Sequence, residues 1–276
     1  MNDIKEKYKL SVFLPTIRTH QLEKWYETLE KACKKYSFQV IFASPFDLPE
    51  SLAKRDNVKL IKSFAHPTKC AHIAALECEG ELIHHNVDDT WFYEDSIDKN
   101  IEFWDKSCYP RDIISMRYIE GQNHATTETF PMDYWKAGTY YPVPHIKPDW
   151  NINCHFMMKK ELFLEYGGFD CKYEYLTYAC QDMLFRMQRD GCRVYDSLCD
   201  VSNADWYPGA MKDHGPIVVA QCHVDEPKFK FEWVYTPGGN PLSKIDIKNH
   251  ELYPEYWARR FAGKKPSTYI ELNLNP

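Results

Sequence analysis

Two adjacent carboxylates, Asp88 and Asp89, form the part of this sequence with the clearest chemical potential. They follow the run Leu82 to Val87 (LIHHNV), whose mostly apolar or aromatic-sized side chains predict a short strand that begins after Gly80. In open α/β sheets, ligands bind at the carboxyl ends of the strands. Two carboxylates there repel each other unless a cation or a strong set of donors lies between them, and their oxygens suit Mg²⁺ or Mn²⁺ shared with phosphates. The alternative for such a pair is a solvated turn in which an Asp caps the next helix.

The elements before this pair predict the sheet that positions it. Strand patterns alternate with amphipathic helix patterns, and the order strand, helix, strand, strand, helix, strand is typical of a mainly parallel sheet with right-handed crossovers. The strands are expected at residues 9–15, 38–43, 58–61 and 82–87, and the helices at 22–33 and 68–79.

The second half of the chain predicts further elements around a long irregular segment. Residues 119–150 are rich in Pro, Gly, His, Thr and aromatic side chains, and a loop of this kind is more often a binding loop than a linker. Gly167 and Gly168 are expected to end a short helix. The predicted helices are 94–106, 159–166 and 178–190, the predicted strands are 111–118, 153–158 and 192–198, and the chain is loop-rich from residue 202.

The composition narrows the class of protein. A chain of 276 residues suffices for one large domain or two small ones, and its net charge of −6 argues against nucleic-acid binding through a broad basic surface. The N-terminus carries charges where a signal peptide needs an apolar core, and no apolar run is long enough to span a membrane. We therefore expect a soluble, cytoplasmic protein without an integral membrane segment. The 10 cysteines are scattered without a C-x-x-C pair, which argues against a structural zinc site.

Four segments in order resemble the large inverting glycosyltransferase family that has a GT-A fold. The likeness covers residues 9–200 and implies an α/β nucleotide-sugar-binding and catalytic domain over residues 1–200, with a mainly parallel central sheet flanked by helices. Residues 201–276 would then be a loop-rich, aromatic extension packed on the same domain, closing the active site. The four segments are LSVFLPT with Arg18 after it, the helix that leads through Gly80 and Glu81 into NVDD, the run KELF to GGFD at 160–170, and QDMLFR at 181–186 with DGCRV after it.

The resemblance implies a metal-bound sugar nucleotide at the acid pair. The family's Asp-x-Asp signature corresponds here to Asn86, Val87 and Asp88. Asp88 would be the metal carboxylate for Mn²⁺ or Mg²⁺, with Asp89 as its support, whereas Asn86 would contact the ribose or the donor sugar. His214 is expected as a third metal ligand, with a purely structural histidine as the alternative. His84 and His85 are expected in the core or lining the cleft.

The other roles follow from the same likeness. Asp182 would be the general base that takes the proton of the acceptor hydroxyl, with a first-turn helix acid as the alternative. Pro15, Thr16 and Arg18 are expected to contact the uracil and the diphosphate. Asp47 is expected to contact the nucleoside unless it is only a turn residue. Asp170 would contact a substrate hydroxyl unless it only caps its turn, and Trp206 would contact the acceptor unless the tail is merely a solvated subdomain.

These expectations add up to a hexosyl- or pentosyltransferase that moves a sugar from a nucleotide donor, a UDP-sugar, to an acceptor hydroxyl with inversion. The acceptor would be a glycan, a lipid-linked sugar or a hydroxymethylated DNA base. One alternative is a nucleotidyltransferase, although residues 16–20 lack the glycine that its phosphate loop needs. The other is a binding module that has lost its chemistry, which Asn86 and Gln181 support and which the retention of Asp88, Asp89 and Asp182 argues against.

Overall fold

A seven-stranded sheet forms the centre of the computed structural model, which describes residues 7–120, 135–204 and 222–274. The strand order is β3-β2-β1-β4-β8-β6-β9; β1 to β4 are parallel, and β8 is antiparallel to both of its neighbours. The mainly parallel sheet predicted from the sequence is therefore confirmed. The strands are β1 (Tyr8–Pro15), β2 (Phe38–Ser44), β3 (Val58–Lys62), β4 (Gly80–His85), β6 (Ile113–Ser115), β8 (Phe156–Lys159) and β9 (Val194–Asp196).

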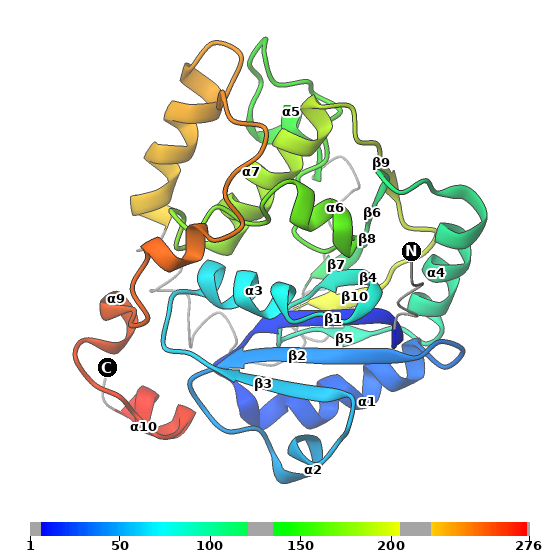
Figure 1. Cartoon of the computed structure of the whole chain (residues 1–276), viewed down its shortest axis with the longest axis vertical. Helices are drawn as coiled ribbons and strands as arrows, with labels where there is room; N and C mark the ends of the chain where they lie inside the picture. Colours follow the sequence, from blue (N-terminus) through cyan, green and yellow to red (C-terminus); the bar gives the residue numbers. More distant parts are fainter. Residues whose placement is uncertain (1–6, 121–134, 205–221, 275–276) are drawn as a thin grey trace, which may run out of the picture.

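Helices cover both faces of this sheet (Figure 1). Strand β1 shows why both faces are apolar: Leu10, Val12 and Leu14 point into the core shared with α1 and α4, while Phe13 points into the core shared with α3 and α7. The longer helices are α1 (Leu22–Ala32), α3 (Pro67–Leu76), α4 (Ser96–Ser107), α6 (Lys160–Glu165) and α7 (Leu176–Arg189), and the short ones are η1 (Thr19–Gln21), α2 (Glu50–Ala53) and α5 (Ala137–Tyr140).

Two glycines end α6 as the sequence predicts. Gly167 and Gly168 have φ values of 77° and 66°, a region that only glycine adopts readily. A side chain on Gly167 would also collide with the carbonyl group of Ile245, because a Cβ atom there would lie 2.0 Å from that oxygen. The turn therefore depends on glycine both for its backbone angles and for its close contact with the C-terminal segment.

A second, small sheet has the order β5-β10-β7 and consists of β5 (Trp91–Phe92), β7 (Tyr118–Glu120) and β10 (Ser202–Ala204). The sequence predicts one strand over 111–118, but the structure divides it between the two sheets. The cause is a change of hydrogen-bond partners at Arg117, whose N–H group donates to the Ser197 hydroxyl and whose carbonyl accepts from Val201. This crossing brings Tyr118 toward the ends of the central strands.

The C-terminal segment packs against the central domain at two places. A helix over residues 222–229 and the π-helix η3 (Lys230–Tyr235) place Phe229 and Trp233 in the same core as α7. Further on, η4 (Asn249–Leu252), α9 (Ala258–Phe261) and α10 (Tyr269–Leu274) lead past the end of β2, where Phe261 packs on Phe46. In the described ranges, no helix has the length and apolar character needed to cross a membrane.

Candidate functional site

A cavity of about 530 Å³ lies at the carboxyl ends of β1, β2 and β4, the edge at which open α/β sheets bind ligands. Many separate regions of the chain form its walls. The lining residues include Pro15 to Arg18 after β1, Ala43 and Pro45 at β2, His85 and Val87 to Asp89 after β4, Tyr175 to Tyr178 and Gln181 of the α7 region, and Trp257, Arg260 and Phe261 of the C-terminal segment.

Arg18 lies between the two carboxylates that the sequence singles out. Its Nε atom donates to Asp88 Oδ1 at 3.0 Å, and its Nη2 atom bonds that oxygen and also Asp89 Oδ2 at 3.1 Å. The second Asp88 oxygen accepts from the Thr16 hydroxyl at 2.6 Å and from the backbone N–H of Arg18 at 3.4 Å. All of these groups are buried. Burial alone would lower the pKa of Arg18, but the charges of Asp88 and Asp89 outweigh it and raise that pKa.

Asn86 holds the loop that carries this pair and does not itself line the cavity. Its side-chain oxygen accepts from Trp25 Nε1 at 3.1 Å and from the Thr90 hydroxyl, and its amide group donates to His84 Nε2 at 3.3 Å. Asn86 is fully buried. The sequence predicts that Asn86 contacts the ribose or the donor sugar. In the structure its hydrogen bonds instead fix the turn after β4, and it lies outside the cavity lining.

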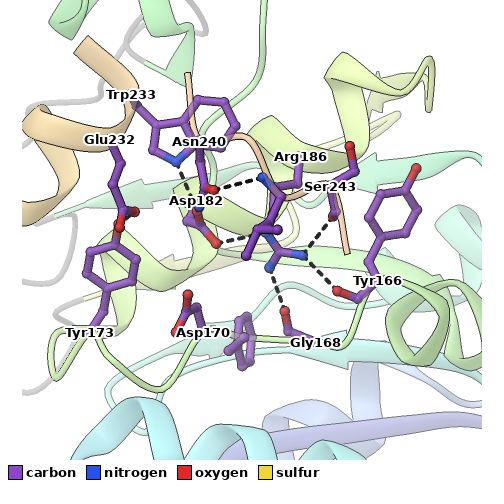
Figure 2. A network of polar contacts seen from close by, with 12 residues as sticks. Tyr166, Gly168, Asp170, Tyr173, Asp182, Arg186, Glu232, Trp233, Asn240 and Ser243 are labelled. Atoms are coloured by element: carbon purple, nitrogen blue, oxygen red, sulfur yellow. Dashed lines mark hydrogen bonds and ion pairs between the residues drawn. The ribbon is translucent and has the colours of Figure 1, made fainter. Parts of the chain in front are cut away.

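Asp182 lies in a buried network away from the cavity lining (Figure 2). Both Asp182 and Arg186 are 0% exposed, and Arg186 Nε donates to Asp182 Oδ2 at 2.9 Å. The other oxygen accepts from Trp233 Nε1 at 2.9 Å and from Asn240 Nδ2 at 3.5 Å. Arg186 also donates to the carbonyl group of Gly168 at 2.8 Å. In this position Asp182 joins α7 to the C-terminal segment, and it is not among the residues that line the cavity.

The neighbouring residue on α7 faces the other way. Gln181 lines the cavity and accepts a hydrogen bond from the Tyr141 hydroxyl at 2.8 Å. One residue along a helix turns the side chain by about 100°. Gln181 therefore reaches the cavity, whereas Asp182 points into the core.

The other predicted site residues divide between the cavity and its surroundings. Pro15, Thr16 and Arg18 line the cavity. Asp47 does not: its side chain is 88% exposed and pairs with Lys62 at 2.7 Å. Asp170 does not line it either, because its carboxylate caps its own turn by accepting from the Lys172 N–H group at 3.1 Å and pairs with the Lys172 ammonium group. Trp206 and His214 lie outside the described residues.

Comparison with solved structures identifies the fold. The chain is similar to S. aureus TarS 1–349 in complex with UDP (TM-score 0.55, 13% identity, 77% of this chain and 65% of that chain). It is also similar to TarS 1–349 in complex with UDP-GlcNAc (0.55, 12%, 93% and 74%) and to TarS (0.53, 14%, 93% and 44%). TarS is a GT-A-type glycosyltransferase. The chain has a GT-A fold.

This result confirms the fold expected from the four sequence segments. The chain spans 65% of the UDP-bound TarS fragment and 44% of the longer TarS chain. No protein-family profile matches the sequence, and no curated protein matches it either. At 12–14% identity the likeness shows the fold alone, and the activity depends on the residues of the site.

An aromatic wall and two histidines complete the cavity of this GT-A fold. Tyr118 stacks on His155 with ring centroids 4.4 Å apart and contacts Trp135 at 4.5 Å. The aromatic richness of residues 119–150 predicts part of this wall, whereas Tyr118, Tyr175 and Tyr178 have no local signal because two separate elements, β7 and the start of α7, supply them. The aromatic lining comprises Tyr118, Trp135, Tyr140, Tyr141, Tyr175, Tyr178, Trp257 and Phe261.

His85 brings a neutral base to the cavity. Its Nδ1 atom donates to the carbonyl group of Cys154 at 2.7 Å, so its Nε2 atom carries the lone pair, and this buried nitrogen has no hydrogen-bond partner in the part of the chain that the structure describes. Burial lowers the pKa of His85 to about 4. It also lowers the pKa of the adjacent His155 well below its usual value. Both imidazoles are therefore neutral at pH 7.

The oxygens of the acid pair are those expected to bind Mn²⁺ or Mg²⁺. Such ions need open oxygen ligands, and here both Asp88 oxygens and one Asp89 oxygen already accept hydrogen bonds or ion pairs. Across the described ranges, no three His, Cys, Asp or Glu residues are grouped as a metal site. In this arrangement the two carboxylates bind Arg18, so a divalent cation would have to displace its guanidinium group.

Proposed function

We propose that this protein transfers a sugar from a nucleotide donor to a hydroxyl group of an acceptor. One observation carries the proposal: in a GT-A fold, Arg18 with Asp88 and Asp89 lies inside a cavity at the carboxyl ends of β1 and β4. That edge is where this class of sheet binds nucleotides. Structures of TarS contain UDP and UDP-GlcNAc, which supports a UDP-sugar as the donor.

The strand order suggests how donor and acceptor divide the cavity. Pro15, Thr16 and Pro45 follow β1 and β2 on one side of β4, and we propose that the nucleoside binds there. Tyr118 and His155 lie on the other side, near β7 and β8, where stacked rings offer a flat apolar surface. Rings of this kind stack on sugars and on bases. A glycan and a hydroxymethylated DNA base are therefore the acceptors that we propose to test.

The proposed reaction is a single displacement with inversion. The acceptor oxygen forms a bond to the anomeric carbon, the bond from that carbon to the diphosphate oxygen breaks, and the proton of the acceptor passes to a base. We assign the base to His85, because this residue lines the cavity and its Nε2 atom carries a lone pair, and not to Asp182, which does not line the cavity. A bound diphosphate would raise the pKa of a nearby imidazole and so strengthen it as a base.

The test is a panel of nucleotide sugars, assayed for thermal stabilisation, donor hydrolysis and transfer to ring-bearing acceptors. We expect one UDP-sugar to stabilise the protein. His85→Gln should bind this donor normally and transfer the sugar at least about 100-fold more slowly. His250→Gln is the matched control, because His250 is not among the residues that line the cavity. A protein that no nucleotide sugar stabilises would refute the proposed function.

A binding module without catalysis is the second candidate. It is favoured by the enclosed Asp182 and by Asn86, which occupies the position of an acid and serves only the loop. The same panel separates the two candidates. Stabilisation by a nucleotide sugar without hydrolysis or transfer, in wild type and His85→Gln alike, would favour the module.

A further inference from the structure

We infer that Arg260, in the C-terminal segment, binds the diphosphate of the donor, so that this segment forms part of the nucleotide site. The inference rests on the proposed function and adds a residue that neither the sequence motifs nor the fold assigns. The charged side chains of the cavity lining support it. Within the described ranges, the cavity lining contains two cationic side chains, Arg18 and Arg260, and two anionic ones, Asp88 and Asp89.

The two arginines come from different elements, Arg18 from the segment after β1 and Arg260 from α9. Arg18 is 6% exposed and its charge is already matched by the two carboxylates that it contacts. A diphosphate that enters next to Asp88 and Asp89 is repelled by them, so it requires additional positive charge. Of the charged residues in the described lining, Arg260 is the one supplied by the C-terminal segment. Arginine also suits phosphate oxygens, because its planar group donates two parallel hydrogen bonds.

Fixed contacts hold Arg260 at the wall. Arg260 lies in the short helix α9, between Arg259 and Phe261. On one side of it, the N–H group of Trp257 donates to the carbonyl group of Phe64 at 2.7 Å, and on the other side Phe261 packs in a cluster with Phe46 and Trp257. The backbone around Arg260 is therefore tied to the ends of β2 and β3, next to the proposed nucleoside position.

Glu174 links this segment to the start of α7. Its carboxylate accepts from Trp257 Nε1 at 2.9 Å and from Arg259 Nε at 2.8 Å. The residues that follow Glu174, from Tyr175 to Tyr178, line the cavity themselves. Arg259 thus points to Glu174, whereas Arg260 points to the cavity, and the two neighbours form a natural matched pair for mutation.

The experiment is calorimetric titration of wild type, Arg260→Gln and Arg259→Gln with UDP and with uridine, in EDTA and again in Mn²⁺. We expect Arg260→Gln to weaken UDP binding about 10- to 100-fold and to leave uridine binding unchanged, because only UDP carries the phosphates. Arg260→Lys should recover part of the loss. Arg259→Gln should keep the wild-type ratio of UDP to uridine affinity, although it removes a contact with Glu174.

Each other outcome overturns a stated part of the account. Wild-type affinity for UDP in Arg260→Gln would refute the role of Arg260 and leave the proposed function intact. No binding of UDP or uridine by wild type would refute both. The phosphate could also belong to a nucleic-acid acceptor, so a single-stranded oligonucleotide is titrated in parallel. If Arg260→Gln weakened the oligonucleotide and not UDP, the assignment to the donor would be wrong.

Discussion

Two arginine–aspartate pairs in this protein have the same chemistry and different surroundings. Arg18 with Asp88 and Asp89 follows the ends of two parallel strands and lines a cavity. Arg186 with Asp182 lies on α7, is 0% exposed and has its partners inside the protein. A charged pair at a strand end can exchange its partners for a ligand, whereas an enclosed pair can be broken only at the cost of two desolvated charges. Access to the cavity, and not residue type, separates the site from the scaffold.

The largest expected effect comes from breaking the enclosed pair. Asp182→Asn leaves the Arg186 charge buried without its counter-ion, and we expect the free energy of unfolding to fall by about 3–5 kcal/mol. Urea denaturation followed by circular dichroism measures it. Glu50→Gln is the control, because Glu50 and Lys54 have the same spacing of four residues but are exposed, and the loss should stay below about 0.5 kcal/mol. Equal losses in the two variants would contradict a structural role for Asp182.

A smaller effect isolates one hydrogen bond of the same network. Trp233→Phe keeps an aromatic ring in the core and removes the Nε1–H group that donates to Asp182 Oδ1. We expect a loss of about 2 kcal/mol, because a carboxylate is then left with one donor fewer in a buried site. The nucleotide affinity should not change. A weaker affinity for UDP without loss of stability would instead place Trp233 in the binding site.

The lowered pKa of His85, which lines the cavity, makes the stability of the protein depend on pH. Burial lowers the pKa of His85 to about 4, whereas in the unfolded chain it titrates near 6.5, so the folded state excludes a proton that the unfolded state accepts. Its contribution to stability is complete above pH 6.5 and is lost as the pH falls toward 4. His85→Gln should therefore flatten the dependence of unfolding free energy on pH by up to about 1.4 kcal/mol per pH unit. Identical slopes for the variant and wild type would show that His85 is protonated in the folded protein.

The sequence predicts the cavity-lining pair better than the enclosed one. Asp88 and Asp89 follow a short apolar strand, and parallel topology alone brings Arg18, at the end of another strand, to the same edge. The environment of Asp182 depends on Trp233 and Asn240, which lie 51 and 58 residues further along the chain and give no local signal. One local signal existed: an Asp and an Arg four residues apart on a helix face each other. That spacing predicts the ion pair but not its burial, since Glu50 and Lys54 have the same spacing and are exposed.

The same distinction explains other differences from prediction. The strands β1 to β4 were predictable because local apolar patterns define them. The division of residues 111–118 between two sheets was not, because it depends on Ser197 and Val201 from a later part of the chain. The role of Asn86 was also hidden, since its partner Trp25 comes from α1.

The most direct test compares Asp88→Asn with Asp182→Asn in one experiment that records the thermal midpoint, the stabilisation by UDP and the rate of sugar transfer. Our account predicts that Asp88→Asn melts nearer the wild-type temperature than Asp182→Asn, because Arg18 keeps Asp89 as a partner, and that UDP stabilises it more than wild type, because one carboxylate that repels the diphosphate has lost its charge. It predicts that Asp182→Asn melts much lower and, below its midpoint, still binds UDP. The contradicting result is an Asp182→Asn protein that melts and binds UDP like wild type but no longer transfers sugar, because Asp182 would then be the catalytic base.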